Sequence, residues 1–318
     1  MKLSTSLKNF QKLHKKKINQ AIFFKQNCKN YSFIENLYKF ILSKKNSFIF
    51  ESVEKGTVRG RYTIIGYNPD KIYNINKKKI VEDNFNKKII IKKNVLSYLN
   101  NLFNSFKVKS SRDLPRMSSM LVGYFSYDII RLIEKIPNKC KGDINIPDIK
   151  LMRPKNLIIY DNVKKKIFYV ENIFNEQKIE NYKFEYGKIK NTFIELMNYG
   201  NINLPSNFYK SKKNIKVRSN ISKRKFKNIV LKAKKFIKKG DIFQVVLSQR
   251  FQASIDKPPI EIYNTLRVLN PSPFMFYFNF EDFQVLGSSP EILVRLISGE
   301  VTVRPIAGTR PRGKNSKE

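Results

Sequence analysis

The sequence predicts an α+β protein in which antiparallel β-sheets pack against helices. Consecutive extended runs are separated by short turns, which favours antiparallel pairing of neighbouring strands. Between these runs lie segments whose apolar residues recur at helical spacing. Apolar residues make up 41% of the 318 residues, which is enough for a sizeable core, and this length suits one or two domains.

Helices and strands alternate over the first 200 residues. Apolar spacing predicts helices over residues 33–42, 95–106, 127–136 and 178–197. Extended runs predict strands over residues 47–52, 61–65, 71–75, 88–91 and 120–125. A hairpin that turns at Asp161-Asn162 is predicted for residues 157–160 and 166–170.

A domain boundary is expected over residues 198–222. This segment is rich in Asn, Ser, Lys and Pro and has little periodicity, which is typical of an exposed connection. We therefore predict an amino-terminal region, residues 1–200, and a second region, residues 201–318.

The second region begins with a predicted amphipathic helix and continues as sheet. Ser222 is suited to cap the start of this helix, and Gly240 to end it in a left-handed conformation. The apolar residues between them fall on one stripe, with lysines opposite. Further along, the pattern predicts a strand over residues 242–251, a helix over 260–269, and strands over 274–280, 283–286, 292–297 and 301–306.

The net charge of +38 raises the possibility of nucleic-acid binding. Residues 210–239 alone carry fourteen Lys or Arg and no acidic residue. The lysines are nevertheless spread over the whole chain and accompany an excess of Ile, Asn and Phe, all encoded by AT-rich codons. Drift in an AT-rich genome explains the whole set, so we expect no nucleic-acid partner, with a working basic surface as the alternative.

Composition excludes several classes of site. Cys28 and Cys140 are too few for a disulfide framework and lack zinc-ligand spacing, which suits the reducing cytoplasm. His14 is the single histidine, so a Ser-His-Asp or Cys-His relay has almost no candidate base, and a histidine-rich metal site cannot be built. No apolar run reaches the about 18 residues of a membrane span, and the first residues lack the apolar segment of a secretory signal. We expect a cytoplasmic protein without membrane contact.

Three segments in the second region are candidates for chemistry. Glu291 directly follows the turn Gly287-Ser288-Ser289-Pro290, where a desolvated carboxyl could act as a general acid; an ordinary turn glutamate is the alternative. Gln244 is a polar residue within an apolar strand and needs a partner, unless it faces solvent. Residues 304–313 hold three arginines and two glycines, which favours an anionic small molecule over a plain basic loop.

Taken together, these segments resemble the motifs of anthranilate synthase component I, a chorismate-utilising enzyme family. The resemblance includes Asn270-Pro271-Ser272-Pro273-Phe274-Met275-Phe276, the turn before Glu291, the strand that contains Gln244, and residues 304–313. It extends upstream to Phe50-Glu51-Ser52, to residues 60–66, to Gly123-Tyr124-Phe125-Ser126-Tyr127-Asp128 and to residues 148–161. Nearly the whole chain from Ser47 onward is covered.

The resemblance implies a fold and an activity. The fold would be the two-part sandwich of chorismate-utilising enzymes, with the tryptophan-binding side in residues 1–200 and the start of the catalytic domain in residues 201–318. The enzyme would need Mg²⁺ to convert chorismate and ammonia into anthranilate and pyruvate, and a glutamine amidotransferase (component II) would supply the ammonia. Glu291 matches the acid that protonates the departing hydroxyl, and Gly308 and Thr309 match the stretch that contacts chorismate.

The resemblance also implies feedback inhibition and separates this chain from sister enzymes. Tryptophan would bind at Ser52, Pro273, Phe274 and Met275, and the family more often has Tyr at the place of Phe274. Enzymes that use water as the nucleophile carry a lysine where Gln244 stands, since water needs a base. Aminodeoxychorismate synthases typically carry a lysine at the place of Ala307. Both positions favour anthranilate synthase, with aminodeoxychorismate or isochorismate synthase as the alternatives.

The carboxyl end departs from the family pattern. Members of the family continue well past the position of Glu318, and the expected Mg²⁺ ligands, a catalytic histidine and further chorismate contacts would lie there. The sequence therefore suggests a fragment or a truncated product with little synthase activity of its own. A surviving tryptophan-binding or subunit-docking module is a third possibility.

Overall fold

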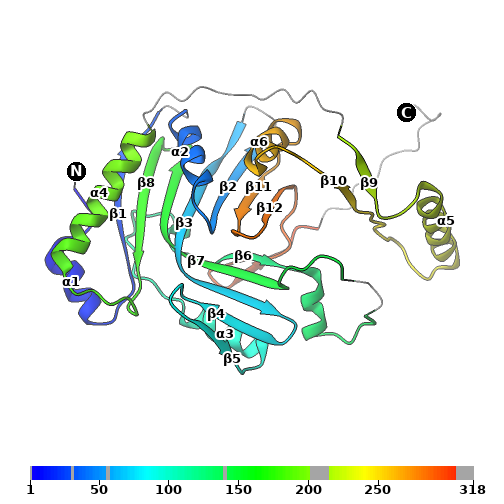
Figure 1. Ribbon diagram of the computed structural model, residues 1–318, viewed down its shortest axis with the longest axis horizontal. Coiled ribbons are helices and arrows are strands. Elements are labelled where there is room, and N and C mark those ends of the chain that lie inside the picture. The colour runs from blue at the N-terminus through cyan, green and yellow to red at the C-terminus, as the bar shows by residue number, and fades with distance from the viewer. Residues whose placement is uncertain (1, 30–31, 55–57, 139–141, 201–214, 306–318) are drawn as a thin grey trace. The chain divides into compact units, whose positions relative to one another are not determined.

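The computed structural model describes residues 2–29, 32–54, 58–138, 142–200 and 215–305 (Figure 1). The chain forms two compact units. Met1–Leu204 and Ile262–Glu318 make the larger unit, and Pro205–Glu261 make the smaller one. The predicted division of the chain between residues 200 and 201 describes functional regions and stays a prediction. The two compact units divide the chain differently, because residues 262–318 belong to the same unit as the amino-terminal residues.

The larger unit is built around one antiparallel sheet. Ten described strands pair in the order β1-β8-β7-β3-β2-β11-β12, with β4, β5 and β6 attached at the side. The strands are β1 Gln20–Asn27, β2 Ser47–Glu54, β3 Val58–Asn76, β4 Lys79–Asp83, β5 Lys88–Ile91, β6 Val122–Phe125, β7 Ile149–Asp161, β8 Lys166–Ile173, β11 Phe274–Asn279 and β12 Gln284–Ser289. Their ladders are antiparallel throughout, which confirms the predicted α+β class.

Strand β3 joins two strands that the sequence predicts separately. Its pairing with β7 shifts register between Pro69 and Lys71, and Asn68 has φ 53°. Because proline donates no backbone hydrogen bond, it is tolerated in a ladder at such an irregularity. Beyond the bulge β3 runs on to Asn76, and its last residues, from Ile72, also pair with β4.

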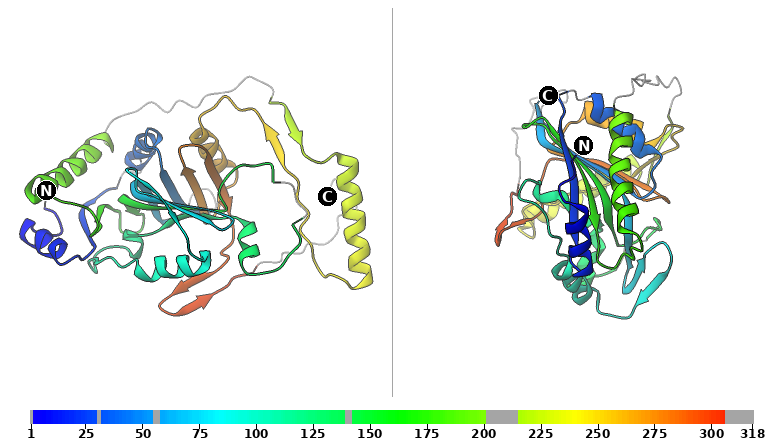
Figure 2. Two further views of the ribbon diagram at one scale, coloured as in Figure 1. Left: turned by 60° about the horizontal axis from the view of Figure 1, so that its bottom comes forward. Right: turned by 90° about the vertical axis from the view of Figure 1, so that its left-hand side faces the viewer.

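Helices accompany the sheet in the larger unit. They are α1 Leu7–Lys15, α2 Ser32–Leu42, α3 Val95–Ser105, α4 Tyr182–Gly200 and α6 Pro259–Leu269, with 3₁₀ turns at Arg116–Ser118 and Tyr127–Leu132. The part of α6 from Ile262 onward belongs to the larger unit. Helices α2 and α4 pack on each other, and α2 also contacts β2 and β3. The right-hand view of Figure 2 shows α4 running along one face of the sheet. None of the described helices combines the length and apolar character needed to cross a bilayer.

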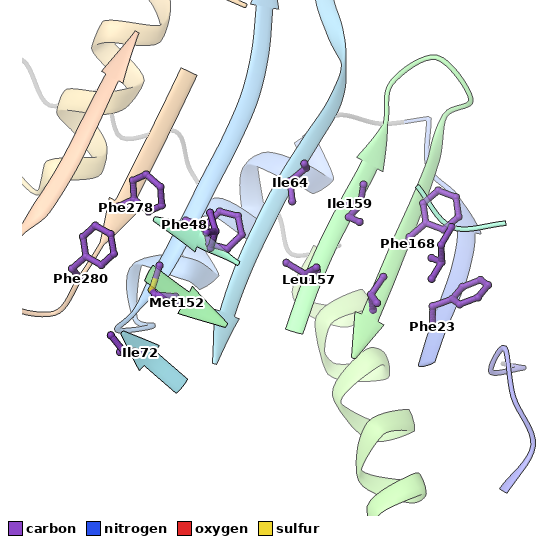
Figure 3. Close-up of a cluster of buried hydrophobic side chains, with 13 residues drawn as sticks. Phe23, Phe48, Ile64, Ile72, Met152, Leu157, Ile159, Phe168, Phe278 and Phe280 are labelled. Atoms are coloured by element: carbon purple, nitrogen blue, oxygen red, sulfur yellow. The ribbon is translucent and has the colours of Figure 1, made fainter. Parts of the chain in front are cut away.

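The opposite face of the sheet carries an extended cluster of buried apolar side chains (Figure 3). Because side chains alternate along a strand, every second residue of each strand reaches this face. Phe48 from β2 and Phe278 from β11 lie there with Ile64, Leu157 and Phe168 of the neighbouring strands, and each is at most 8% exposed. Strands far apart in the sequence therefore share one core.

The smaller unit contains helix α5 Lys223–Lys239 and the strand pair β9 Val217–Ser219 and β10 Phe251–Ala253. Both predicted caps of α5 are confirmed: the Ser222 side chain accepts from the Lys225 amide, and Gly240 has φ 79°. The strand predicted over residues 242–251 is wrong, since most of this segment is coil and β10 begins only at Phe251. No described strand pairs with residues 242–250, and Phe243 is 99% exposed, so the alternating pattern has neither a partner strand among the described residues nor a face to bury.

Two helix predictions also need correction. The helix predicted over residues 127–136 is a 3₁₀ turn over Tyr127–Leu132, and its N-cap Ser126 makes no side-chain cap bond. The side chain of Arg131 donates to the carbonyl oxygens of Ile136 and Pro137, which holds the following residues in a turn. Helix α4 starts later than predicted because the Asn181 side chain accepts from the Phe184 amide and caps it there.

Candidate functional site

A cavity of about 730 Å³ opens on the apolar-cluster face of the sheet in the larger unit. Its lining comes from strands β2, β3, β6, β11 and β12 and from the segment that follows β12. The residues are Phe50, Glu51, Ser52, Tyr62, Ile64, Gly123, Tyr124, Pro273, Phe274, Met275, Phe276, Phe278, Val285, Pro290, Ile292 and Arg304. We call this space the sheet cavity.

Ser52 reaches the sheet cavity at an irregularity in the pairing of β2 with β3. The pairing of β2 with β3 shifts register between Glu51, opposite Thr63, and Val53, opposite Arg59, so the extra residues of this bulge are on β3 and Ser52 lies across from them. At such a bulge the ladder is interrupted, and the side chains around it are re-aimed. Opposite Ser52 stands Gly60, where a Cβ atom would lie 1.9 Å from the Ser52 Oγ. The glycine therefore leaves the space that the serine hydroxyl occupies.

The turn before β11 is held against Ser52 by the backbone. The amide of Val53 donates to the carbonyl oxygen of Ser272 at 2.8 Å, which fixes the turn to β2. The Ser272 Oγ is buried and accepts from the Phe274 amide at 3.3 Å. Strand β11 then pairs with β2, with Met275 opposite Glu51. Residues more than 200 positions apart in the sequence are thus fixed side by side.

Glu51 anchors this strand from the opposite face of the sheet. Its carboxylate accepts from the Tyr38 hydroxyl at 2.5 Å and from the Tyr263 hydroxyl at 2.7 Å, and it lies 3.0 Å from the Arg267 Nε. The Glu51 side chain is 1% exposed. The buried carboxylate ties α2 and α6 to the strand that carries Ser52.

The walls of the sheet cavity are aromatic and its rim carries a cation. Phe50, Tyr62 and Phe276 present rings from three strands. Burial raises the pKa of Tyr124 to about 12, so its hydroxyl is neutral near pH 7; this hydroxyl donates to the Pro147 carbonyl oxygen at 2.8 Å. Arg304 is exposed and contributes a guanidinium. The arrangement suits a planar apolar ring that bears a carboxylate.

The structure places the predicted site residues in two groups. Ser52, Pro273, Phe274 and Met275, predicted for tryptophan, all line the sheet cavity. The residues predicted for chorismate chemistry are not gathered in this way.

Glu291 is exposed in the coil after β12, although its neighbours Pro290 and Ile292 line the sheet cavity. Gln244 is exposed in the coil of the smaller unit. Gly308 and Thr309 lie outside the described residues, as does Ala307. The described part of the chain therefore does not bury the Glu291 side chain, as the prediction of a desolvated carboxyl requires.

Several wall residues were not singled out from the sequence. Tyr62, Tyr124 and Phe276 lie within segments that carry the resemblance, but the alternation of a strand does not say which face holds a cavity. That signal appears only when β2, β3, β6 and β11 come together.

A magnesium site has no support among the described residues. No group of three or more His, Cys, Asp or Glu side chains is placed there so that it could hold a metal ion. We therefore assign no catalytic step to Mg²⁺ from this structure.

Comparison with known proteins gives consistent matches. A sequence profile described as chorismate binding enzyme matches residues 45–318. The chain is 38% identical to anthranilate synthase component 1 of Acetivibrio thermocellus over 288 residues, covering 89% of this chain and 58% of that protein. It is 35% identical to anthranilate synthase component 1 of Cereibacter sphaeroides, covering 99% of this chain and 64% of that protein.

A solved structure agrees with these matches. The crystal structure of anthranilate synthase component I from Streptococcus pneumoniae superposes with a TM-score of 0.65 at 27% identity, over 79% of this chain and 55% of that chain. The chain thus spans less than two thirds of the length of these relatives.

Proposed function

The chain belongs to the chorismate binding enzyme family, and from this premise we propose that it is the large subunit of an anthranilate synthase. The proposed reaction converts chorismate and ammonia into anthranilate and pyruvate, as the first step toward tryptophan. The support is the similarity to proteins named anthranilate synthase component 1 at 35–38% identity. Since those relatives are longer, the activity is proposed for the whole subunit.

The observation that carries the proposal furthest is the composition of the sheet cavity. We propose that it binds tryptophan as a feedback inhibitor, with Ser52 on one side and Pro273, Phe274 and Met275 on the other. The aromatic walls would stack on the indole, and Arg304 at the rim would attract the carboxylate. Phe274 supplies a ring without a hydroxyl, so it would contribute packing and no hydrogen bond.

The catalytic part of the proposal rests on residue types. Glu291 would protonate the hydroxyl that leaves chorismate, and Gly308 with Thr309 would contact the substrate. Gln244 cannot act as a base, which fits ammonia as the nucleophile because ammonia needs no deprotonation before it attacks. A glutamine amidotransferase would supply that ammonia, Mg²⁺ would be the cofactor, and the proposed location is the cytoplasm.

The activity is tested with chorismate, Mg²⁺ and ammonium salts in the presence of the full subunit. Anthranilate formation, followed by its fluorescence, is the expected result, and glutamine should replace ammonium only when the amidotransferase is present. Isochorismate or aminodeoxychorismate as the product would instead assign the chain to a sister enzyme.

The tryptophan site is tested by calorimetry on the chain itself. Wild type should bind tryptophan, and Ser52→Phe should weaken binding by about tenfold or more, because a ring in place of the hydroxyl fills the β2 side of the sheet cavity. Ser97→Phe, an exposed position on α3, is the matched control and should bind like wild type. Equal affinities for wild type and Ser52→Phe would contradict the assignment.

A further inference from the structure

A second cavity of about 420 Å³ lies on the helix-covered face of the sheet in the larger unit. The residues after α2, one face of α4, and strands β3, β7 and β8 surround it. Its lining is Ser43, Lys44, Lys45, Tyr67, Asn68, Lys155, Asn156, Glu171, Lys188 and Thr192. We call it the lysine cavity. None of its lining residues lines the sheet cavity.

A row of polar side chains forms the floor of the lysine cavity. Tyr67 pairs with Asn156 between β3 and β7, and Asn156 pairs with Glu171 between β7 and β8. Residues in register on adjacent strands point to the same face, so the three side chains lie next to one another. They are 5%, 4% and 7% exposed, respectively. Burying a polar group is unfavourable unless it finds a partner, so each member of the row must be accounted for.

Two members of the row are satisfied within the protein. The Asn156 side chain accepts from the Asn68 Nδ2 at 2.9 Å and donates to the Glu171 Oε2 at 3.1 Å. The other carboxylate oxygen of Glu171 lies 3.9 Å from the Lys155 Nζ.

Tyr67 is the exception in this row. Its hydroxyl is buried, and among the described residues it has no hydrogen-bond partner. The ring is fixed edge-to-face against Phe40, with centroids 5.5 Å apart. A rigid tyrosine therefore holds a free donor at the floor of the lysine cavity.

The charge around the lysine cavity is positive. Four lysines line it against one carboxylate, that of Glu171. Lys45 is paired with Glu281 at 2.7 Å, and Lys155 lies beside Glu171. Lys44 and Lys188 have no ion-pair partner in the part of the chain that the structure describes. Lys188 is exposed, and the Lys44 Nζ lies 4.8 Å from the centroid of the Phe40 ring. Because an ammonium group only donates hydrogen bonds, both groups can accept an anion from outside the chain as a partner.

We propose that the lysine cavity binds a small oxyanion, inorganic phosphate or the phosphate or carboxylate group of a metabolite. Lys44 and Lys188 would supply the charge, and the hydroxyls of Tyr67 and Thr192 would donate hydrogen bonds. Thr192 lies four residues after Lys188 on α4, so both side chains stand on the same helix face. An oxyanion offers several acceptor atoms to these convergent donors, whereas a cation would meet four lysines.

The test is calorimetric titration of the full chain with inorganic phosphate and, separately, with malonate. Tyr67→Phe and Lys188→Gln should each weaken binding of the preferred anion by about fivefold or more. Tyr67→Phe keeps the ring and removes only an oxygen that has no described protein partner, so the fold should be retained. Lys190→Gln is the matched control, because this exposed lysine on the same helix does not line the lysine cavity and its loss should leave affinity unchanged.

A further variant is expected to bind the anion more tightly than wild type, which separates the proposed site from a general loss of binding caused by altered charge or folding. Glu171→Gln removes the carboxylate from the lining and should tighten phosphate binding by about threefold or more. Tighter binding of phosphate than of malonate identifies a phosphate group as the ligand, and the reverse identifies a carboxylate. Equal affinity in Tyr67→Phe, Lys188→Gln and Lys190→Gln, weaker binding in Glu171→Gln, or no binding of either anion would overturn the proposal.

Discussion

The buried carboxylate of Glu51 provides a sharp test of how the sheet cavity is held together. Glu51→Gln removes the negative charge while keeping the shape of the side chain and one oxygen acceptor. Arg267, whose side chain is 14% exposed, would then lose its carboxylate partner at 3.0 Å. The perturbation is confined to the network on the helix side of β2 and leaves Ser52 unchanged.

The expected size of the effect follows from the geometry. At 3.0 Å and an effective dielectric constant of about 20, the attraction between the two charges is about 5 kcal/mol. Part of this attraction is offset because the neutral amide of the variant is less costly to bury than a carboxylate. Removing one partner of such a buried pair generally costs about 3–5 kcal/mol of stability. One tyrosine hydroxyl also loses a charged acceptor, which is worth about 1.5–3 kcal/mol. We therefore expect Glu51→Gln to lower the free energy of unfolding by about 3 kcal/mol or more.

The assay is urea unfolding followed by far-UV circular dichroism, since the chain has no tryptophan to serve as a fluorescent probe. Arg267→Met and the double variant complete a thermodynamic cycle. The double variant should be more stable than the sum of the single effects predicts, by about 2 kcal/mol, because the two groups interact directly. Glu300→Gln, at an exposed position, is the control and should change stability by less than about 0.5 kcal/mol. A loss below about 1 kcal/mol for Glu51→Gln, or additive effects, would refute the reasoning.

Three further predictions concern other buried positions. Burial raises the pKa of Glu171, so its contribution favours the fold at low pH and is lost as the pH rises through that raised pKa; Glu171→Gln should be more stable than wild type by about 1 kcal/mol near pH 8, and no more stable near pH 4. In Gly66→Ala the new methyl group would lie 2.1 Å from the fully buried Phe48 ring, so we expect a loss of about 2 kcal/mol in urea unfolding. Phe193→Ala removes a ring that is 1% exposed and lies 5.8 Å from the Tyr169 ring, which should cost about 3–5 kcal/mol in the same assay.

Each of these predictions has a contradicting result. Equal stabilities of Glu171→Gln and wild type near pH 8 would mean that Lys155 and Lys188 fully compensate the buried charge. A neutral Gly66→Ala would mean that β2 and β3 separate at little cost. A loss below about 1 kcal/mol for Phe193→Ala would mean that α4 contributes little to the fold.

Elements specified by neighbouring residues were predicted well. Helix α5 has its caps at Ser222 and Gly240, as its sequence indicates, and helix α2 and strand β2 follow their apolar patterns. The hairpin of β7 and β8 turns where predicted, because the Asp161 side chain accepts from the amides of Val163 and Lys164. Each of these signals lies within a few residues of the structure that it specifies.

Elements that need distant partners were predicted less well. Helix α1 and strands β1 and β4 were not predicted, and β3 was expected as two pieces. Strand β1 exists because it pairs with β8, from Gln20 opposite Ile173 to Asn27 opposite Lys166. Conversely, residues 242–250 have an alternating pattern but no described partner strand, and they are coil.

The fold class, the family and four residues of the sheet cavity could be inferred from the amino-acid sequence alone. Ser52, Pro273, Phe274 and Met275 could be named from their motifs, but only the tertiary structure placed β11 beside β2 and made one cavity of them. The row formed by Tyr67, Asn156 and Glu171 likewise exists only through strand register. The physical reason is that periodicity and capping are properties of short segments, whereas the pairing of strands distant in sequence is decided by burying both faces of the finished sheet.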